Sequence, residues 1–401
     1  MDLDSFFVSV ERLFDKSLIG KPVIVGGSSN RGVVSSCSYE ARKFGVHSAM
    51  SIVKARKLCP HGIFVSGRMS DYGHYSKMVT DIIAERAPMF EKASIDEFYV
   101  DLTGMDKYYG CWKWSTELRQ AIVRETNLPI SFGLSINKML AKMATNEGKP
   151  NGQYMIELGK EQEFLDPKPV GKIPFCGDKT VKFLNDKGIH TIYDLRQFSP
   201  EALNNWLGKH GYDLWNRAHG RGTAELHPYH DPKSMSSERT FNADTDDADW
   251  LKKVIISLTE KLGFELREEK KLTKCVAIKI RYSDFSTYTR QLAIPATSNS
   301  KILMEVALKI FAEAYDTNRD VRLIGVKLSN LEEGAYQINM FDDNEKEVLL
   351  YKAIDEMKAK HGLNKVTLAQ NIGLGNVKRN DPEADMNREV KREQSKSKKE
   401  G

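Results

Sequence analysis

The chain has 401 residues, which is more than one domain usually contains and therefore predicts several domains. Hydrophobic residues make up 40% and charged residues 29%, a globular balance that excludes a wholly disordered or fibrous chain. The net charge of +5 is too small to identify an anionic partner, so the position of the charge is more informative than its sum.

The first 160 residues alternate apolar runs with amphipathic stretches, which is typical of an α/β domain. Apolar residues recur at helical spacing over residues 6–14, so we expect a helix there with Asp4 or Ser5 as its N-cap. Strands are expected at residues 22–25, 32–35, 95–102 and 130–136, and further helices at residues 51–58 and 112–126.

The composition changes at residues 166–169, which contain two prolines and predict a domain boundary. Short helices joined by glycine turns follow as far as residue 222, among them helices at residues 192–196 and 200–207, so this part is expected to be a small all-helical unit. Residues 227–237 contain two more prolines and no sustained periodicity, which indicates an interdomain linker. From Glu238 the expected order is strand, helix, strand, strand, helix, strand, which is a split βαβ pattern.

Positive charge concentrates on one predicted hairpin of this last domain, over residues 271–290. Its cations are Lys271, Lys274, Lys279, Arg281 and Arg290, against Asp284 as the one acidic residue. Such a surface is suited to nucleic-acid phosphates. Beyond residue 334 a tail is expected, and its last twenty residues are polar and rich in Lys and Glu, which is typical of disorder.

Two acidic pairs are candidates for metal chemistry. Asp2 and Asp4 lie at the N-terminus, although Asp4 taken alone is better explained as a helix cap. Asp96 and Glu97 lie in apolar β sequence, where charges are costly unless they meet partners or cations. Neighbours in a regular strand point to opposite faces, so both reach one metal ion only at a strand end or hairpin turn. A strand-borne Asp near a separate acidic pair fits two-metal phosphoryl transfer.

Two segments are candidates for binding phosphate. Residues 36–45 gather hydroxyls, a tyrosine and two cations, and a helix starting at Tyr39 would place Arg42 within one turn of it. A solvated helix face is the alternative interpretation. Lys149 lies on the turn of residues 148–152, where a phosphate contact and an ordinary turn are almost equally good explanations. The sequence has no G-x-x-x-x-G-K-[ST] motif, which excludes a P-loop enzyme.

Four motifs in this order resemble the Y-family, lesion-bypass DNA polymerases, most closely the bacterial DNA polymerase IV branch (DinB type). They are residues 2–11, 39–46, 94–97 and 149–152, and the resemblance extends over about residues 1–335. It implies a multi-domain α/β and α+β right-hand polymerase with a ferredoxin-like palm, small fingers, an all-helical helix-hairpin-helix thumb and a split-βαβ little finger. The implied ranges are 1–6 and 67–165 for the palm, 7–66 for the fingers, 166–226 for the thumb, 227–237 for a linker, 238–334 for the little finger and 335–401 for the tail.

The resemblance implies a template-directed DNA polymerase that performs translesion synthesis on primer-template DNA. It would transfer a dNTP to a primer 3′-hydroxyl by a two-metal mechanism, with low fidelity because no segment resembles a proofreading nuclease. The implied catalytic carboxylates are Asp2, Asp96 and Glu97, which together with the main-chain carbonyl of Leu3 would hold two Mg²⁺ ions, with Mn²⁺ as a possible substitute.

The same resemblance assigns the residues that contact substrates. Phe7 matches the aromatic steric gate that leaves no room for a 2′-hydroxyl, while Val33 and Ser35 would roof the nascent base pair. The implied triphosphate ligands are Ser36, Tyr39, Arg42 and Lys149. The implied DNA-binding cations of the little finger are Lys274, Lys279, Arg281 and Arg290.

The sequence departs from the family pattern at two places. Only Met1 precedes Asp2, where the family has several apolar residues, so the chain is expected to be truncated or its start displaced. If the strand is missing, weaker anchoring of Asp2 follows. The thumb turn, normally Gly-x-Gly, reads Phe175-Cys176-Gly177, so one position at which backbone amides approach a DNA phosphate is lost.

The tail contains a motif that resembles the peptide by which such polymerases dock on the sliding clamp. Its residues are Gln337, Ile338, Met340 and Phe341. Gln337 would supply hydrogen bonds, while Met340 and Phe341 would fill an apolar pocket. Residues 345–361 are amphipathic and predict a helix whose purpose the sequence does not indicate.

Two other functions remain compatible with parts of the sequence: a nucleotidyl cyclase, because palm-like two-metal domains also serve that chemistry, and a non-catalytic adaptor between DNA and clamp. No run approaches the roughly 18 apolar residues of a membrane-spanning helix, so we expect a cytoplasmic protein without a membrane partner. The five cysteines form no C-x-x-C pair, which argues against disulfides and structural zinc. Nothing in the sequence suggests self-association, so a monomer is expected; it does not indicate which lesions are bypassed.

Overall fold

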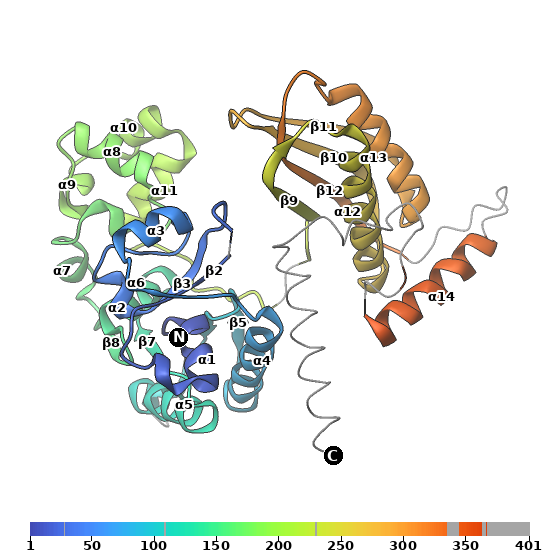
Figure 1. The fold of residues 1–401 in the computed structure, drawn as a ribbon. Helices are drawn as coiled ribbons and strands as arrows, with labels where there is room; N and C mark the ends of the chain where they lie inside the picture. The colour runs from blue at the N-terminus through green and yellow to red at the C-terminus, as the bar shows by residue number, and fades with distance from the viewer. Residues whose placement is uncertain (28, 108–109, 229–230, 335–344, 363–365, 367–401) are drawn as a thin grey trace, which may run out of the picture. The chain divides into compact units, whose positions relative to one another are not determined.

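The computed structural model describes residues 1–362 and 366, except for residues 28, 108–109, 229–230 and 335–344. It divides into two compact units, which are described separately (Figure 1). The first unit consists of residues 1–28 and 32–230, and the second of residues 29–31 and 231–401. Among the described helices, none is long and apolar enough to cross a membrane.

The first unit is built around small sheets that meet at the N-terminal residues. β1 (Asp2–Leu3) pairs antiparallel with β7 (Ile130–Leu134), which pairs in parallel with β8 (Gln153–Met155). β5 (Phe90–Lys92) and β6 (Phe98–Val100) form a hairpin, and an antiparallel bridge between Asp2 and Glu97 joins this hairpin to β1. The helices of this part are α1 (Phe6–Phe14), α4 (Met69–Arg86), α5 (Cys111–Thr126) and α6 (Lys138–Gly148).

These elements share one apolar core, which explains why the chain folds back onto its first residues. Leu3 and Val8, from β1 and α1, are buried with Ile83 of α4, Ile122 of α5 and Ile130 of β7. The last turn of α5 ends at Asn127, whose φ of 56° lies in the left-handed region that asparagine tolerates at helix ends. The core therefore fixes the ends of β1 and of the β5–β6 hairpin, where the acidic residues lie.

The predicted strand over residues 95–102 is too long at both ends, because β6 spans only Phe98–Val100. β6 begins only at Phe98, because the amides of Ala93 and Ser94 both donate to the carbonyl of Glu97 and close a hairpin turn. Asp96 and Glu97 thus lie in a turn rather than in a regular strand. This is the arrangement that the sequence required if both carboxylates were to face one site.

A second small sheet in the first unit carries the predicted phosphate-binding segment. β3 (Val34–Cys37) pairs antiparallel with β2 (Val23–Gly26), which pairs in parallel with β4 (Ile63–Val65). The helices of this part are α2 (Tyr39–Arg42), which Ser38 caps by accepting from the amide of Ala41, and α3 (Ile52–Leu58), which Ser51 caps. Buried Ile24, Val34 and Ile52 hold these elements together in a core of their own.

The rest of the first unit is all-helical, as the sequence predicted. Its helices are α7 (Glu161–Leu165), α8 (Asp178–Asp186), α9 (Ile192–Arg196), α10 (Pro200–Leu207) and α11 (Lys209–Ala218). A single turn of 3-10 helix occurs in this part at Val170–Lys172, and two others occur earlier in the unit at Lys16–Leu18 and Met105–Lys107. Local signals explain the boundaries, because Thr191 and Asp194 form a capping box for α9 and Pro200 follows the N-cap Ser199 of α10.

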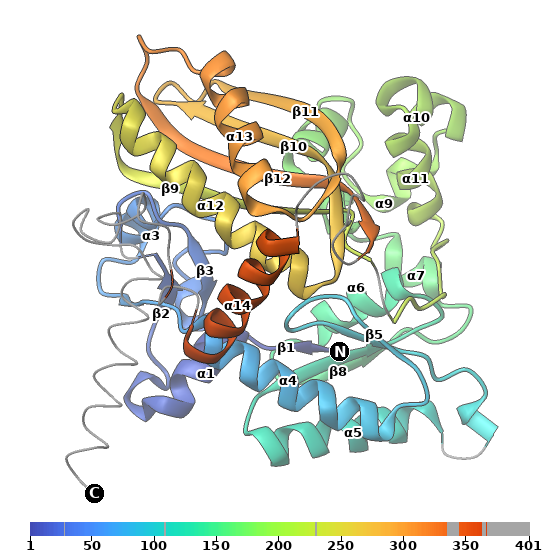
Figure 2. The same cartoon turned by 90° about the vertical axis from the view of Figure 1, so that its right-hand side faces the viewer.

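The second unit is a four-stranded antiparallel sheet with two helices packed against it (Figure 2). The strand order is β11-β10-β12-β9, formed by β9 (Ser234–Thr245), β10 (Lys271–Tyr282), β11 (Thr287–Thr297) and β12 (Val321–Glu333). The helices are α12 (Ala248–Glu268) and α13 (Ser300–Ala314). This is the strand and helix order expected from the sequence, with β10 and β11 as the predicted hairpin.

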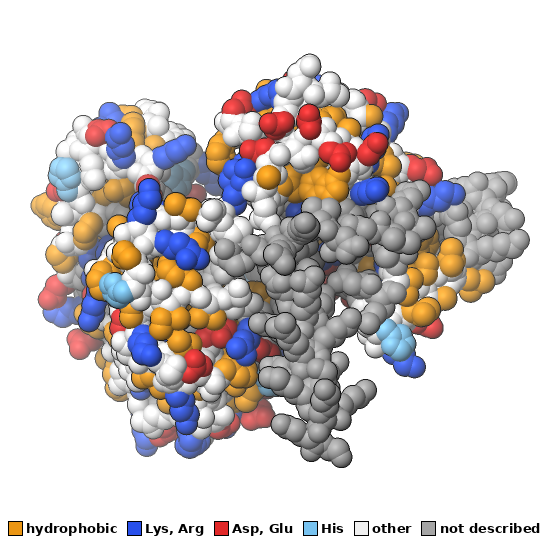
Figure 3. All heavy atoms as spheres, viewed as in Figure 1, with side chains coloured by type: hydrophobic (Ala, Val, Ile, Leu, Met, Phe, Trp, Pro, Cys, Tyr) orange, Lys and Arg blue, Asp and Glu red, His pale blue; other side chains and the backbone are white. Residues whose placement is uncertain are grey.

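The helix expected near the end of the chain is present as α14 (Glu345–His361) and belongs to the second unit. Arg267 of α12, whose side chain is 5% exposed, forms a bidentate ion pair with Asp355 at 2.6 and 2.9 Å, and Lys358 pairs with Glu260 at 2.7 Å. Hydrophobic side chains remain exposed on α14, among them Leu349, Leu350 and Met357 (Figure 3). Ion pairs to α12 therefore contribute to the docking of this helix.

Candidate active site

Asp2 and Glu97 meet at the centre of the first unit because β1 is bonded on both of its sides. Asp2 pairs with Ser131 of β7, while the amide of Leu3 donates to the carbonyl of Asp96 at 3.0 Å and that of Phe98 to the carbonyl of Met1 at 3.0 Å. Asp2 is 4% exposed. The two-residue strand is thus held in place, and the weak anchoring expected from the sequence is not observed.

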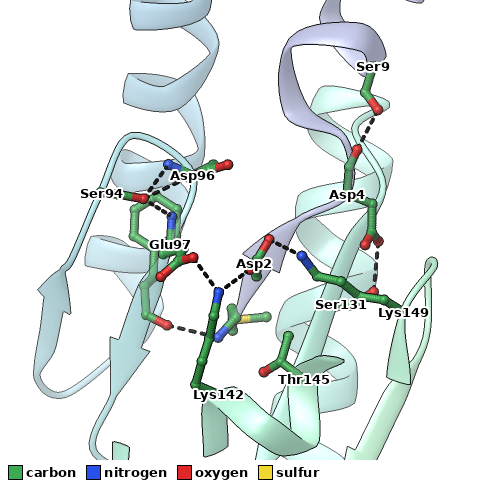
Figure 4. A network of polar contacts seen from close by, with 12 residues as sticks. Asp2, Asp4, Ser9, Ser94, Asp96, Glu97, Ser131, Lys142, Thr145 and Lys149 are labelled. Carbon is green, nitrogen blue, oxygen red and sulfur yellow. Dashed lines mark hydrogen bonds and ion pairs between the residues drawn. The ribbon is translucent and has the colours of Figure 1, made fainter. Parts of the chain in front are cut away.

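Two lysines neutralise these carboxylates, as Figure 4 shows. Lys142 of α6 donates to Asp2 at 2.5 Å and also to Glu97, and Lys149 donates to the other oxygen of Asp2. Burial alone would raise the pKa of Asp2, but the two ammonium groups outweigh it and hold that pKa below its usual value. Burial alone would lower the pKa of Lys142, but the carboxylates of Asp2 and Glu97 outweigh it and raise that pKa.

Lys142 was missed by the sequence interpretation. The one feature of the sequence that could have indicated it is its position seven residues before Lys149, on α6, the helix that ends directly before this lysine. Seven residues make two helical turns, so both lysines fall on the same side of α6.

Asp96 lies beside this ion-pair cluster but is not part of it. Its carboxylate accepts from the hydroxyl of Ser94 at 2.7 Å, and the Ser94 oxygen in turn accepts from the amide of Glu97 at 3.1 Å (Figure 4). Within the described parts of the chain, no three Asp, Glu, His or Cys side chains are grouped closely enough to form a ready-made metal site. The donors nevertheless suit a hard cation, because carboxylate and carbonyl oxygens are the ligands that Mg²⁺ and Mn²⁺ prefer.

A cavity of about 420 Å³ opens over these residues and collects most of those predicted to contact metal ions and nucleotide. Its lining includes Asp2, Leu3, Phe7, Ser35, Ser36, Arg42, Asp96, Glu97, Lys142 and Lys149. Two of the residues predicted to contact the nucleotide are outside the lining: Tyr39, whose hydroxyl donates to Asp4, and Val33, which is 52% exposed. One cavity therefore joins an acidic wall, a cationic wall and an aromatic ring.

The aromatic ring is that of Phe7, and it rests on a rigid support. The ring stacks on that of Tyr72 of α4, with centroids 4.1 Å apart and planes 9° apart. Tyr72 is fully buried and donates its hydroxyl to the buried carboxylate of Glu11 at 2.6 Å. Burial, together with this bond, raises the pKa of Tyr72. Phe7 is therefore held at the edge of the cavity rather than free to swing away.

The cationic wall comes from α2 and the end of α6. The guanidinium of Arg42 lies over the ring of Tyr39, 4.9 Å from its centroid, as expected for residues one turn apart. The Tyr39 hydroxyl donates to Asp4 at 3.1 Å, and burial followed by the charge of Asp4 raises the pKa of Tyr39. Arg42 thus offers a cation to an anionic group in the cavity, and Lys149 would offer a second one once its ammonium leaves Asp2.

The interpretation of Asp4 as a helix N-cap is wrong. Ser5 occupies the cap position of α1 without a capping side-chain bond, and the carboxylate of Asp4 turns into the interior, where the residue is 2% exposed. It accepts from the hydroxyl of Ser131 at 2.7 Å and from the amide of Asn151 at 2.8 Å, besides Tyr39. Asp4 therefore links the segment of α2 to the turn that carries Lys149.

The predicted DNA-binding cations lie on the sheet of the second unit, and acidic neighbours partly neutralise them. Lys279 pairs with Glu238 of β9 at 2.9 Å and Lys274 pairs with Glu332 of β12. Arg281 donates to the Thr287 hydroxyl at 2.9 Å inside the hairpin. The local charge of this hairpin is therefore less effective than the sequence suggested.

Two further predictions concern the turn at residues 175–177 and the clamp-binding motif of the tail. In the turn Phe175-Cys176-Gly177, Phe175 is 81% exposed with a φ of 69°, and Arg217 lies over its ring, 4.8 Å from the centroid. A bulky aromatic residue thus occupies the position where the family has glycine. The predicted clamp-binding residues Gln337, Ile338, Met340 and Phe341 lie outside the described residues.

Comparison with known proteins supplies the family. Residues 1–146 match the impB/mucB/samB family, and residues 232–340 match its C-terminal domain. A DNA polymerase IV of Treponema denticola is 38% identical over 334 residues, which are 83% of this chain and 85% of that relative. A DNA polymerase IV of Dehalococcoides mccartyi is 36% identical over 379 residues, 93% of this chain and 97% of the relative.

Solved structures agree with this relationship. A Y-family DNA polymerase chimera of Dbh and Dpo4 has a TM-score of 0.71 and 27% identity, covering 83% of this chain and 98% of its own. An insertion ternary complex of Dbh DNA polymerase has a TM-score of 0.60 and 26% identity, with the same coverage. The right-hand polymerase fold class expected from the sequence is thereby confirmed. The chain belongs to the impB/mucB/samB family, the Y-family DNA polymerases, in their DNA polymerase IV branch.

Proposed function

We propose that this protein is a template-directed DNA polymerase of low fidelity that synthesises DNA across damaged templates. The single observation that carries the proposal is the cavity in which the Asp2 and Glu97 carboxylates face the cations Arg42 and Lys149 beside the ring of Phe7. Acidic residues for metal ions, cations for a triphosphate and a ring for the sugar are what nucleotidyl transfer to a primer requires.

Divalent metal ions are required by this family, and we propose two Mg²⁺ ions, which Mn²⁺ could replace. Asp2, Asp96, Glu97 and the carbonyl of Leu3 would hold them. When bound, the ions would activate the primer 3′-hydroxyl and neutralise the charge of the triphosphate and the leaving pyrophosphate. Asp96 would reach an ion by giving up its bond from Ser94, which costs little because the residue is half-buried and solvent can replace that bond.

The remaining residues of the cavity would bind and orient the nucleotide. Arg42 would pair with triphosphate oxygens, and Lys149 would do so on leaving Asp2. The hydroxyl of Ser36 would supply a neutral donor, and that of Tyr39 would do so on leaving Asp4. Phe7 would pack beneath the sugar and exclude a 2′-hydroxyl. Val33 and Ser35 would cover the base pair, and their small side chains would leave room for damaged template bases.

The domain division of the proposed enzyme follows the sequence expectation. The palm would comprise residues 1–6 and 67–165, the fingers 7–66, the thumb 166–226 and the little finger 238–334, after a linker at 227–237. The tail, residues 335–401, would bind the sliding clamp through Gln337, Ile338, Met340 and Phe341. We propose that the protein is a cytoplasmic monomer and that its partners are primer-template DNA and the clamp.

Primer extension with Mg²⁺ tests the proposed activity. The purified protein is expected to add dNTPs to a primer only when a template is annealed. Incubation with NTPs and no primer should give no cyclic nucleotide, whereas such a product would favour a cyclase. Tight DNA binding without incorporation under any metal would favour an adaptor.

Deleting residues 337–341 tests the clamp proposal. The variant should extend a primer on naked DNA at the wild-type rate, because none of these residues is a proposed catalytic or nucleotide-binding residue. Stimulation by a loaded bacterial clamp should be lost, as the apolar anchors Met340 and Phe341 are removed. Equal stimulation of the variant and the wild type would contradict the proposal.

The little-finger cations are expected to differ in their effect on DNA affinity. Arg281 has no acidic partner among the described residues, so Arg281→Ala should weaken binding several-fold and reduce the slope of log affinity against log salt by about 1. Lys279→Ala should have the smaller effect, because this ammonium must leave Glu238 before it can contact a phosphate. Fluorescence anisotropy between about 50 and 200 mM salt measures both. Equal effects would mean that the ion pair does not restrain Lys279.

A further inference from the structure

The turn that carries Lys149 is held from outside the cavity by an arginine of a different element. Arg119 lies on α5, is half-buried and is not part of the described cavity lining. Its guanidinium donates to the carbonyl of Ile130 at 2.9 Å, to the side-chain oxygen of Asn151 at 2.6 Å and to the carbonyl of Asn151. One planar group thus connects the first residue of β7 to the residue two positions after Lys149.

Asn151 is also held from the other side. Its amide donates to the buried carboxylate of Asp4 at 2.8 Å, so backbone and side-chain atoms of one residue are bound from two directions. Its φ of 48° lies in the left-handed region, which asparagine adopts more readily than most other residues. The contacts from Arg119 and Asp4 together hold Asn151 in this backbone conformation.

The turn has little room in which to adjust if one of these contacts is lost. A Cβ at Gly152 would lie 2.1 Å from the carbonyl oxygen of Gly148, so the two ends of the turn are already in close contact. The amide of Gly152 donates to the hydroxyl of Ser131 at 3.1 Å, which ties it to β7. If Asn151 were displaced, the turn could therefore not absorb the shift, and the backbone of Lys149 would move with it.

We infer that Arg119 is a positioning residue for nucleotide binding: it holds Asn151 and so places the ammonium of Lys149 where it meets the triphosphate. Arg119 itself contacts no nucleotide. The inference rests on the proposed role of Lys149 as a triphosphate ligand and adds the residue that makes that role possible. Misplacement of a binding group by about 1 Å can cost as much as its removal, so a remote residue of this kind has a measurable effect.

Single-turnover incorporation of one dNTP tests the inference on the full-length protein. Arg119→Ala should weaken the apparent affinity for dNTP about tenfold, while the maximum rate changes less and the affinity for primer-template DNA changes under about twofold. Arg119→Lys should lie between, because one ammonium can bond Asn151 but cannot also span to Ile130. If the melting curve shows that Arg119→Ala does not fold, Arg119→Lys is used for the test instead.

Arg124→Ala is the matched control. This arginine lies on the same helix, is 72% exposed and pairs only weakly with Glu125 at 3.4 Å, so its removal should leave dNTP affinity unchanged. An Arg119 variant that behaves like the Arg124 variant would overturn the inference.

A double-mutant cycle with Lys149→Ala separates positioning from general damage. If Arg119 acts through Lys149, its loss should have almost no further effect on dNTP affinity in the Lys149→Ala background. Additive losses would overturn the inference, since Arg119 would then act by another route. If Lys149→Ala alone leaves dNTP affinity unchanged, the proposed role of Lys149 fails instead, so the two failures are distinguishable.

Discussion

Asp2→Asn should reduce the rate of nucleotide incorporation by at least about 1,000-fold, because the amide keeps the shape of the side chain but cannot hold a divalent ion or offset its charge. The variant should also melt at a lower temperature. Two half-buried ammonium groups, those of Lys142 and Lys149, lose the carboxylate that they share. Single-turnover primer extension measures the first effect and thermal unfolding without metal the second.

Asp96→Ala should lose activity to a similar extent for a different structural reason. The Asp96 carboxylate is bonded to Ser94 and is not part of the ion-pair cluster, so its removal should change the melting temperature much less. Glu91→Gln is the control, since Glu91, like Asp2, is a buried carboxylate paired with a lysine: it pairs with Lys138 at 2.9 Å. It should lose stability and keep its activity. Extension by Asp96→Ala at the wild-type rate would contradict the metal-site assignment.

Phe7→Ala should raise the incorporation of ribonucleotides relative to deoxyribonucleotides by about 100-fold or more. The ring is fixed by its stack on Tyr72, so a 2′-hydroxyl cannot push it aside, and discrimination rests on a steric clash that alanine removes. Competition between rNTP and dNTP on one template measures the ratio.

Phe14→Ala is the control for this result. Phe14 ends the same helix, is 49% exposed and does not line the described cavity, so its loss should leave the ratio unchanged. Unchanged selectivity of the Phe7 variant would mean that another residue excludes the 2′-hydroxyl.

The sequence predicted the elements well where local signals are strong. Helices at residues 192–196 and 200–207 have the expected bounds because a capping box and an N-terminal proline define their starts. The strand at residues 95–102 was predicted too long, because the turn before Phe98 depends on two amides that donate to one carbonyl. Apolar composition alone does not contain that information.

The motif residues were found because their order resembles a family, but the residues that support them were not. Lys142 is an unremarkable helix lysine until the fold places it between Asp2 and Glu97. Asp4 next to Ser5 has the local pattern of a helix cap, and only the approach of Tyr39 and Asn151 from distant segments gives its carboxylate a different role. Such residues are defined by tertiary contacts, which one sequence does not display.

The most direct test of the proposed function is single-nucleotide primer extension by the purified protein across a panel of damaged templates, with Mg²⁺ and an undamaged template for comparison. The expected result is template-dependent incorporation opposite at least one lesion, with frequent misinsertion on the undamaged template and no activity in Asp2→Asn. Failure to extend a primer on any template while primer-template DNA is bound, or equal extension by Asp2→Asn, would contradict the account.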